Sequence, residues 1–295
     1  MKISIITPAL NAERFIPRAL ESIQSQTFHG SIEHIVMDGG SQDKTVSISK
    51  KYNNVQVYSE KDEGIYDGIN QGIQISSGDI IGFLNSDDIL SPDCLNIVQH
   101  YFSKYNIDIL TGSCSFIDEN ENYIFNRITP TKNPHQKGIL FGVPAINARF
   151  FKKEAFLKVG MFDKNFRLAA DRHWLLRSLN YDLSYRFTEE LFYLYRFHKN
   201  SSTISGSIES KIKIYEEHRK LFYFALSGRD FSKPADNLSN LTAWRFIEQL
   251  KFEIQTSKSI YKRFFLIIKE MARNPVLLFT SVLSWRRYRA RHSDS

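Results

Sequence analysis

The chain has 295 residues, of which 42% are hydrophobic and 24% are charged, a balance that is typical of a folded globular protein and excludes a disordered one. This length allows one large α/β domain with an appendage, or two modest domains. Residues 1–200 carry 22 Lys and Arg against 23 Asp and Glu, whereas residues 201–295 carry 17 against 9, so the whole net charge of +7 arises in the last third.

The first 84 residues alternate short apolar runs with amphipathic runs. Strands are predicted where apolar and β-branched residues cluster, at Ile3–Thr7, Glu33–Met37, Val55–Ser59 and Ile80–Leu84. Helices are predicted between them, at Ala12–Gln26, Asp43–Tyr52 and Ile65–Ser76. The fourth strand is apolar at nearly every position, which indicates burial on both faces. This rhythm predicts an α/β fold with a mostly parallel, doubly wound sheet flanked by helices.

The pattern after the fourth strand is less regular. Residues 110–165 are predicted to form β-hairpins and loops, Asp171–Leu179 a helix and Leu191–Tyr195 a strand. From about Ser205 onward the chain is helical in pattern and basic. We therefore expect an α/β domain over residues 1–205 and a helical, basic extension over residues 206–295.

Polar, turn-forming residues follow three of the strands: Thr7-Pro8, Asp38-Gly39-Gly40-Ser41 and Asn85-Ser86-Asp87-Asp88. Ligands of doubly wound sheets bind beyond the carboxyl ends of the strands, so all three segments are expected on one rim. The adjacent carboxylates of Asp87 and Asp88 repel each other unless a cation lies between them, and a hard divalent cation also holds phosphate oxygens. A solvated Asp pair that begins a loop is the alternative.

The segment Asp38–Ser41 and the segment Gly64–Gly72 are each open to two interpretations. Asp38 is suited to accept hydrogen bonds from a base or ribose beside a glycine turn, or it forms a simple Asx turn before a helix. The glycines and Asn70 of the second segment are suited to bring a helix close to a diphosphate, or they pack that helix tightly on the sheet.

Two downstream segments are equally ambiguous. Asp171 is placed either as a general base at a helix start or as the N-cap of that helix. His198 is suited to bind a metal and Arg196 to bind phosphate, but both also fit a basic, solvated loop.

In their order and spacing these segments resemble family 2 glycosyltransferases of the GT-A fold. The resemblance covers roughly residues 1–205 and rests on the start Ser4–Asn11, the helix end Gln24–Thr27, Asp38–Thr45, Gly64–Asp67, Gly78–Ile81, Asn85–Asp88 and Asp171. The chain is most similar to the subgroup used in bacterial O-antigen, capsule and exopolysaccharide assembly.

The resemblance implies a role for each matching residue. Asp87 resembles the metal-binding aspartate of the family's DXD motif, with Asp88 beside it and His198 near the metal and the diphosphate. Asp171 resembles the catalytic base. Asp38 resembles the first of two base-recognising aspartates, and Gly39 replaces the second, which leaves the base open. Asn85 takes the first acidic place of the DXD motif, which leaves its contact with ribose or metal open. The expected donor contacts are Thr7, Pro8, Ala9, Asn11, Asp38, Gly40, Asp67, Asn70, Asn85, Ser86 and Arg196.

The activity that the resemblance implies is an inverting transfer of sugar from a nucleoside-diphosphate sugar to a hydroxyl of a polyprenyl-diphosphate-linked glycan, with Mg²⁺ or Mn²⁺ as the cofactor. A sugar nucleotidyltransferase is one alternative, but it needs a phosphate loop rich in glycine and Lys or Arg, which Pro8–Glu13 does not supply. A non-catalytic, membrane-bound scaffold is another, and the presence of both Asp87 and Asp171 disfavours it.

The basic end of the chain predicts an anionic partner. The stretch Val276–Trp285 is almost wholly apolar and four arginines follow it, which is typical of an interfacial helix on an anionic membrane. A helix that packs on its own domain or on a second subunit is the alternative. No nucleic-acid motif accompanies the charge, and with only Cys94 and Cys114 no disulfide framework is indicated. We expect a cytoplasmic protein, peripheral on the inner face of the plasma membrane.

Overall fold

The computed structural model describes residues 1–128, 139, 146–198, 208–226, 244–245, 248–249 and 252. The predicted interfacial stretch Val276–Trp285 and the arginines after it lie outside these residues. Within them, no helix is both long enough and apolar enough to cross a membrane.

The first half of the chain folds as the hydrophobic pattern predicts. Its elements are β1 (Lys2–Ala9), α1 (Ile16–Gln24), β2 (Ser31–Asp38), α2 (Thr45–Ser49), β3 (Val55–Ser59), α3 (Ile65–Ile75) and β4 (Ile80–Phe83). Helix α1 begins four residues later than expected, with a proline in its first turn, where the missing N–H has no helical partner to lose. Strand β4 is buried at every position, as its apolar sequence predicts.

The second half contains elements that the pattern does not reveal. They are β5 (Ile89–Leu90), α4 (Cys94–Lys104), β6 (Ile109–Ile117), β7 (Tyr123–Ile128), the 3₁₀ turn η1 (Ile146–Ala148), β8 (Arg149–Lys152), α6 (Lys153–Val159), α7 (Ala170–Ser178), β9 (Tyr185–Arg196) and α8 (Ile208–Leu226). The β6–β7 hairpin agrees with the expectation for residues 110–165. Helix α6 does not, because a seven-residue helix carries too few turns to show a period.

The strands form one sheet in the order β3-β2-β1-β4-β8-β6-β9-β5, with β7 beside β6. Strands β1 to β4 pair in parallel, as expected. Strand β8 runs antiparallel between β4 and β6, and β9 returns parallel to β6. Because two reversals separate β4 from β6 and β9, the carboxyl ends of β1, β2, β3, β4, β6 and β9 share one edge of the sheet.

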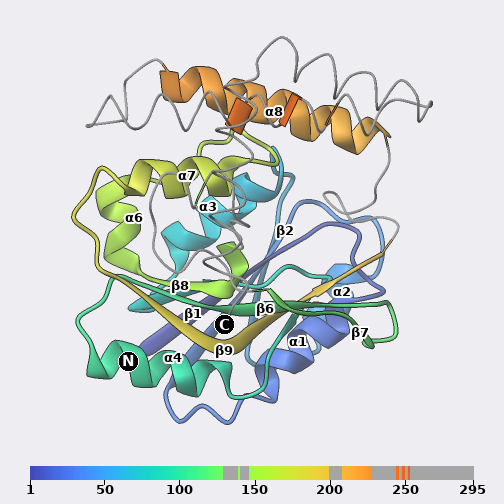
Figure 1. Ribbon diagram of the computed structural model, residues 1–295. Coiled ribbons are helices and arrows are strands. Elements are labelled where there is room, and N and C mark those ends of the chain that lie inside the picture. Colours follow the sequence, from blue (N-terminus) through green and yellow to red (C-terminus); the bar gives the residue numbers. More distant parts are fainter. Residues whose placement is uncertain are drawn as a thin grey trace.

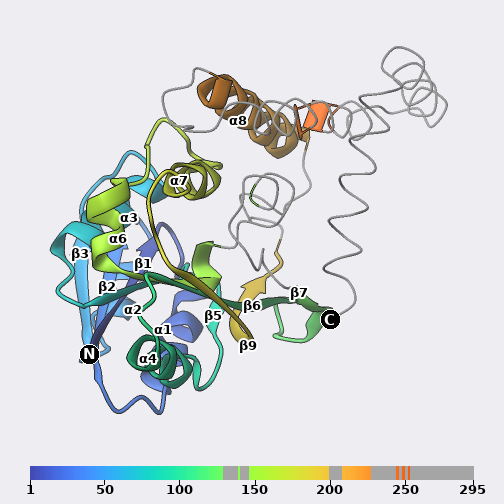
Figure 2. The same cartoon turned by 60° about the vertical axis from the view of Figure 1, so that its left-hand side comes forward.

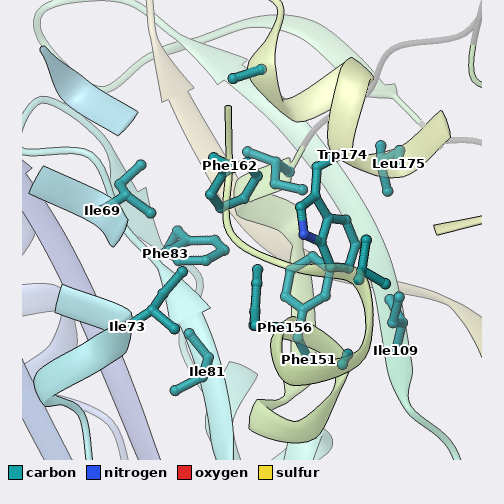
Figure 3. Packing of buried hydrophobic residues seen from close by; sticks show 14 of the residues in the cluster. Ile69, Ile73, Ile81, Phe83, Ile109, Phe151, Phe156, Phe162, Trp174 and Leu175 are labelled. Atoms are coloured by element: carbon teal, nitrogen blue, oxygen red, sulfur yellow. The ribbon is translucent and has the colours of Figure 1, made fainter. Parts of the chain in front are cut away.

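Helices cover both faces of the sheet (Figure 1). The face that carries α3, α6 and α7 is filled by large side chains, with Phe83, Phe151, Phe156 and Phe162 around Trp174 (Figure 3). The Trp174 indole donates a hydrogen bond of 2.7 Å to the carbonyl of Gly160, which satisfies its buried N–H. Both cysteines are buried and unbridged, as expected.

Helix α8 lies beyond α7, on the side away from the sheet (Figures 1 and 2). It belongs by sequence to the predicted extension, yet Leu221 on its inner face is fully buried in the same hydrophobic cluster as α7. The first helix of the extension therefore packs on the α/β part of the chain.

Candidate active site

The shared strand edge gathers the predicted site segments. The turn after β2, the loop after β4 and the residues after β9 all leave the sheet there, and the β6–β7 turn, at residues 118–122, joins them. We refer to this edge as the rim.

The centre of the rim is a contact between Asp87 and His198. Asp87 Oδ2 lies 2.9 Å from His198 Nε2, although the two residues are 111 positions apart. The ring of Phe15, which precedes α1, lies 4.9 Å from the imidazole between centroids and supports it from one side. The imidazole is largely buried and the carboxylate is half-buried, with side-chain exposures of 9% and 29%.

These two groups fit a divalent cation. Two neighbouring ligands of an octahedral ion, each at about 2.1 Å, lie about 3 Å apart, close to the distance between these atoms. A carboxylate oxygen and an imidazole nitrogen are both suitable donors for Mn²⁺, and the carboxylate for Mg²⁺. Among the residues described, no group of three or more His, Cys, Asp or Glu side chains is arranged to hold a metal. A cation here needs further oxygen ligands, such as diphosphate oxygens and water.

Asp88 faces away from this contact. Its carboxylate is buried and accepts hydrogen bonds from the Tyr193 hydroxyl at 2.8 Å, from the Arg196 backbone N–H at 2.7 Å and from the Asn85 amide at 3.0 Å. Burial, followed by the charge of Asp87, raises the pKa of the Asp88 carboxyl well above its ordinary value. This geometry makes Asp88 the anchor that ties the loop after β4 to β9, rather than a metal ligand.

Arg196 is also an anchor. Its guanidinium is almost completely buried and donates to the Asp87 carbonyl at 2.9 Å and to Glu121 at 3.0 Å. It also donates to the carbonyls of Asp118 and Glu119 at 3.3 and 3.2 Å. The expected contact with a diphosphate is disfavoured by this geometry, because the planar fork already binds four protein groups. Arg196 instead clamps the loop of Asp87 to the β6–β7 turn.

The turn after β2 is built by Asp38. Its buried carboxylate accepts hydrogen bonds from Ser59 Oγ at 2.7 Å, from the N–H groups of Gly40 and Ser41 at 3.2 and 3.1 Å, and from the Ser41 hydroxyl. Gly40 has a φ of 91°, which side chains rarely adopt. Asn11, itself left-handed with a φ of 49°, accepts from the Gln42 N–H at 2.9 Å. Asp38 and Asn11 therefore shape the loops at the rim.

Asp62 is a rim carboxylate that the sequence reasoning missed. A Cβ atom on Gly39 would lie 2.8 Å from Asp62 Oδ2, so the acidic side chain occupies the space beside the glycine. Burial, with the charges of Asp67 and Asp38, raises the pKa of Asp62, although the Gly64 N–H opposes this. The glycine at position 39, seen as a departure from the acidic pattern, is the feature that points to this neighbour.

Three of the other predicted donor residues make structural contacts. Asn70 pairs with the backbone of Phe162, donating at 2.9 Å and accepting at 3.0 Å. Asp67 accepts from the Glu63 N–H at 3.1 Å and pairs with Lys164 at 3.0 Å. Thr7 Oγ1 lies 2.9 Å from the buried His34 Nε2. Pro8 and Ala9 end β1 at the rim, and Ser86 lies half-buried in the loop of Asp87.

Asp171 is the second residue of α7. The N-cap is Ala169, so the expectation of an Asp171 N-cap is wrong, and its Oδ1 accepts from the N–H of Arg172 at 2.6 Å instead. Burial raises the pKa of Asp171 above its ordinary value, although Arg172, His218 and Arg149 oppose the shift. A carboxylate with a raised pKa at a helix start is suited to accept a proton.

Asp171 and the loop of Asp87 face a common region. After burial, the charges of both Asp88 and Asp171 raise the pKa of the Tyr195 hydroxyl, which places this β9 side chain near both. Arg149, buried beside Thr111 on β6, lies near Asp171 and Tyr195 as well. Asp171 therefore lies near the end of β9, the strand that holds the loop of Asp87.

Comparison with known proteins identifies the family of the chain. The family model described as Glycosyl transferase family 2 matches residues 4–166. An uncharacterized glycosyltransferase of Mycobacterium tuberculosis is 32% identical over 182 residues, covering 60% of this chain and 68% of its own. A PGL/p-HBAD biosynthesis glycosyltransferase of Mycobacterium bovis is 26% identical over 189 residues, covering 59% and 68% respectively.

Two solved structures have a similar fold. S. aureus TarS in complex with UDP-GlcNAc has a TM-score of 0.71 at 17% identity, covering 97% of this chain and 88% of its own. The mannosyltransferase PcManGT from Pyrobaculum calidifontis, in complex with GDP-Man and Mn²⁺, has a TM-score of 0.61 at 14% identity, covering 99% and 88%. These likenesses confirm the predicted fold class, a GT-A α/β fold.

Proposed function

The chain belongs to glycosyl transferase family 2, and on this premise we propose that it transfers a sugar, with inversion, from a nucleoside-diphosphate sugar to a hydroxyl of a glycan acceptor. The contact between Asp87 and His198 carries this proposal, because a carboxylate and an imidazole 2.9 Å apart on the rim offer the start of a cation site. The neighbours bound to UDP-GlcNAc and to GDP-Man with Mn²⁺ support a nucleotide-sugar donor and a divalent cation.

The donor would lie along the rim. The half-buried turn at Gly40 and Ser41, which Asp38 holds in shape, would lie against the nucleoside, and Asp62 would supply a carboxylate next to it for a base or ribose. Asp87 and His198 would hold a Mg²⁺ or Mn²⁺ ion, which when bound would offset negative charge on the leaving diphosphate. Arg196 and Asp88 keep the loop of Asp87 in position through β9.

Asp171 would act on the acceptor. It would accept the proton of the attacking hydroxyl as the new glycosidic bond forms at the anomeric carbon and the bond to the diphosphate breaks. A single in-line displacement of this kind inverts the anomeric configuration. The raised pKa of Asp171, which results from its burial, makes the carboxylate a better proton acceptor than an exposed aspartate.

The acceptor proposal depends on the basic end of the chain. A polyprenyl-diphosphate-linked glycan on an anionic membrane would explain why the whole positive excess lies after residue 200. A role in surface polysaccharide assembly follows from such an acceptor. Binding of the full chain to vesicles with and without anionic lipid tests this part separately from catalysis, and equal binding to both would contradict it.

The decisive experiment is a panel of UDP-, GDP- and dTDP-sugars assayed for nucleoside diphosphate release, with and without a chelator. We expect release from one class of donor, loss of release with the chelator, and a loss of about 100-fold or more for both Asp87→Ala and Asp171→Asn. Near-normal turnover by either variant would contradict the role given to that residue. Pyrophosphate release from a nucleoside triphosphate would instead indicate a nucleotidyltransferase.

A further inference from the structure

A carboxylate from α8 holds the backbone that leads into the helix of Asp171. Glu217 Oε1 accepts the N–H of Arg167 at 2.6 Å, and Oε2 accepts the N–H groups of Leu168 and Ala169 at 2.7 and 3.0 Å. Three consecutive backbone donors thus converge on one side chain that lies 48 to 50 positions further along the chain. A carboxylate bound in this way makes strong, charge-assisted hydrogen bonds.

This contact lies directly before α7, the helix that carries Asp171. Ala169 is the N-cap of α7, no side chain of the helix caps it, and Asp171 follows two residues later. Glu217 is buried, with 8% exposure, and its charge contributes, after burial and Asp171, to the raised pKa of Tyr66. Glu217, Tyr66 and Asp171 therefore form one neighbourhood.

The middle of α7 is fixed independently. Trp174 packs against Phe151 and Phe156, with ring centroids 5.3 and 5.0 Å away, in the main hydrophobic cluster. The helix body is thus held by the core, while the entry to the helix is held by α8. Removing the Glu217 contact should free residues 167–169 without unfolding the sheet or disturbing the rim residues Asp87 and His198.

We propose that Glu217 is the positioning residue for Asp171: by binding three backbone N–H groups, it sets the place from which the carboxylate receives the acceptor proton. This inference rests on the proposed function, in which Asp171 is the base. It also assigns α8, the start of the predicted basic extension, to the acceptor side of the catalytic machinery.

The first test does not need activity. Hydrogen exchange in a peptide covering residues 166–171 should become about tenfold faster in Glu217→Gln, because the amide cannot accept all three bonds. Glu216→Gln is the matched control, since Glu216 is exposed on the same helix. Unchanged exchange in Glu217→Gln would show that Glu217 does not hold the backbone of residues 167–169, whichever reaction the protein catalyses, and would overturn the proposal.

The second test separates positioning from a general structural role. With the donor identified by the panel, Glu217→Gln should lower kcat about tenfold or more and leave the donor KM and the nucleoside diphosphate Kd unchanged. Equal losses of kcat, nucleotide binding and melting temperature would show that Glu217 acts only through folding, and would overturn the proposal.

The third test links Glu217 to Asp171 through a double variant. If Glu217 acts through the base, Glu217→Gln should add little to the loss already caused by Asp171→Asn. A full additional loss in the double variant would place Glu217 elsewhere in the reaction and overturn the proposal. Normal turnover by Asp171→Asn alone would instead reject the proposed base, and hydrogen exchange would still report whether the anchor exists.

Discussion

His198 Nε2 lies 2.9 Å from Asp87 Oδ2, and this contact joins the carboxyl end of β4 to the residues that follow β9. Neither side chain forms a metal site alone, and the two meet only because β9 returns to the rim beside β6. The Phe15 ring, 4.9 Å from the imidazole, restricts its rotation. The distance and the Phe15 ring together hold the two proposed cation ligands side by side.

We first predict that His198→Ala raises the Mn²⁺ or Mg²⁺ concentration needed for half-maximal rate by about 10-fold or more, because one of two protein ligands is lost. Initial rates measured against metal concentration at saturating donor check this. His29→Ala is the control, since His29 is exposed and remote from the rim contacts described. An unchanged metal dependence in His198→Ala would remove the histidine from the site.

A second prediction concerns Arg196. The Arg196 guanidinium binds the Asp87 carbonyl and three groups of the β6–β7 turn. A single lysine ammonium group cannot replace these contacts, so Arg196→Lys should destabilise the protein by about 2 kcal/mol. The free energy of unfolding in urea measures this. Arg186→Lys, exposed on the same strand, is the control. A variant of normal stability with weakened nucleoside diphosphate binding would restore the phosphate role that the sequence suggested.

The third prediction concerns the space between Gly39 and Asp62. Gly39→Ala places a methyl group 2.8 Å from Asp62 Oδ2 and should displace that carboxylate, which raises the Kd for the nucleoside diphosphate about tenfold. Calorimetric titration with UDP and GDP measures the change. In an Asp62→Ala background the same methyl group meets no carboxylate and should have little further effect. Full additivity of the two substitutions would show that Gly39 matters for another reason.

The fourth prediction is a pH dependence that arises far from the rim. Burial alone would raise the pKa of Glu33, but hydrogen bonds from Ser4, Ser77 and Lys2 outweigh it and lower the pKa from 4.5 to about 2. A depressed carboxyl pKa stabilises the folded state above the unfolded value, and this stability is lost as the pH falls from 4.5 toward 2. Glu33→Gln should therefore lower the free energy of unfolding near neutral pH. The further loss of stability as the pH falls from 4.5 toward 2 should be smaller in the variant than in wild type.

Urea unfolding at several pH values in that window measures the effect as the difference between wild type and variant. Glu60→Gln, an exposed change in the same half of the chain, should leave the profile unaltered. A Glu33→Gln profile parallel to that of wild type would contradict the assignment.

Local periodicity was enough to predict the first half of the fold. Strands β1, β2 and β3 pair in chain order, and the apolar run of β4 indicates burial on both faces. Strand β5, two residues long, and helix α6 are too short to show a period, so only their tertiary partners define them.

The residue types of the site could be predicted from the sequence, but the groups that these residues bind could not. The sequence showed that Asp38 and Arg196 are polar residues at strand ends and that Asn70 lies in a glycine-rich helix, which suits both ligand binding and structural anchoring. The structure gives each of them protein partners, in the case of Asn70 a backbone 92 positions away. The role of Glu217 could not be predicted for the same reason, because its partners are backbone N–H groups, which leave no pattern of side chains in the sequence.

Strand β9 also has a consequence for the order of assembly. It inserts between β6 and β5, and β5 pairs with it across about a hundred residues of intervening chain. As the chain leaves the ribosome, β1 to β4 can pair before β9 and His198, the partners of β5 and Asp87, have been made. The first four strands can thus pair before β9 brings His198 to Asp87.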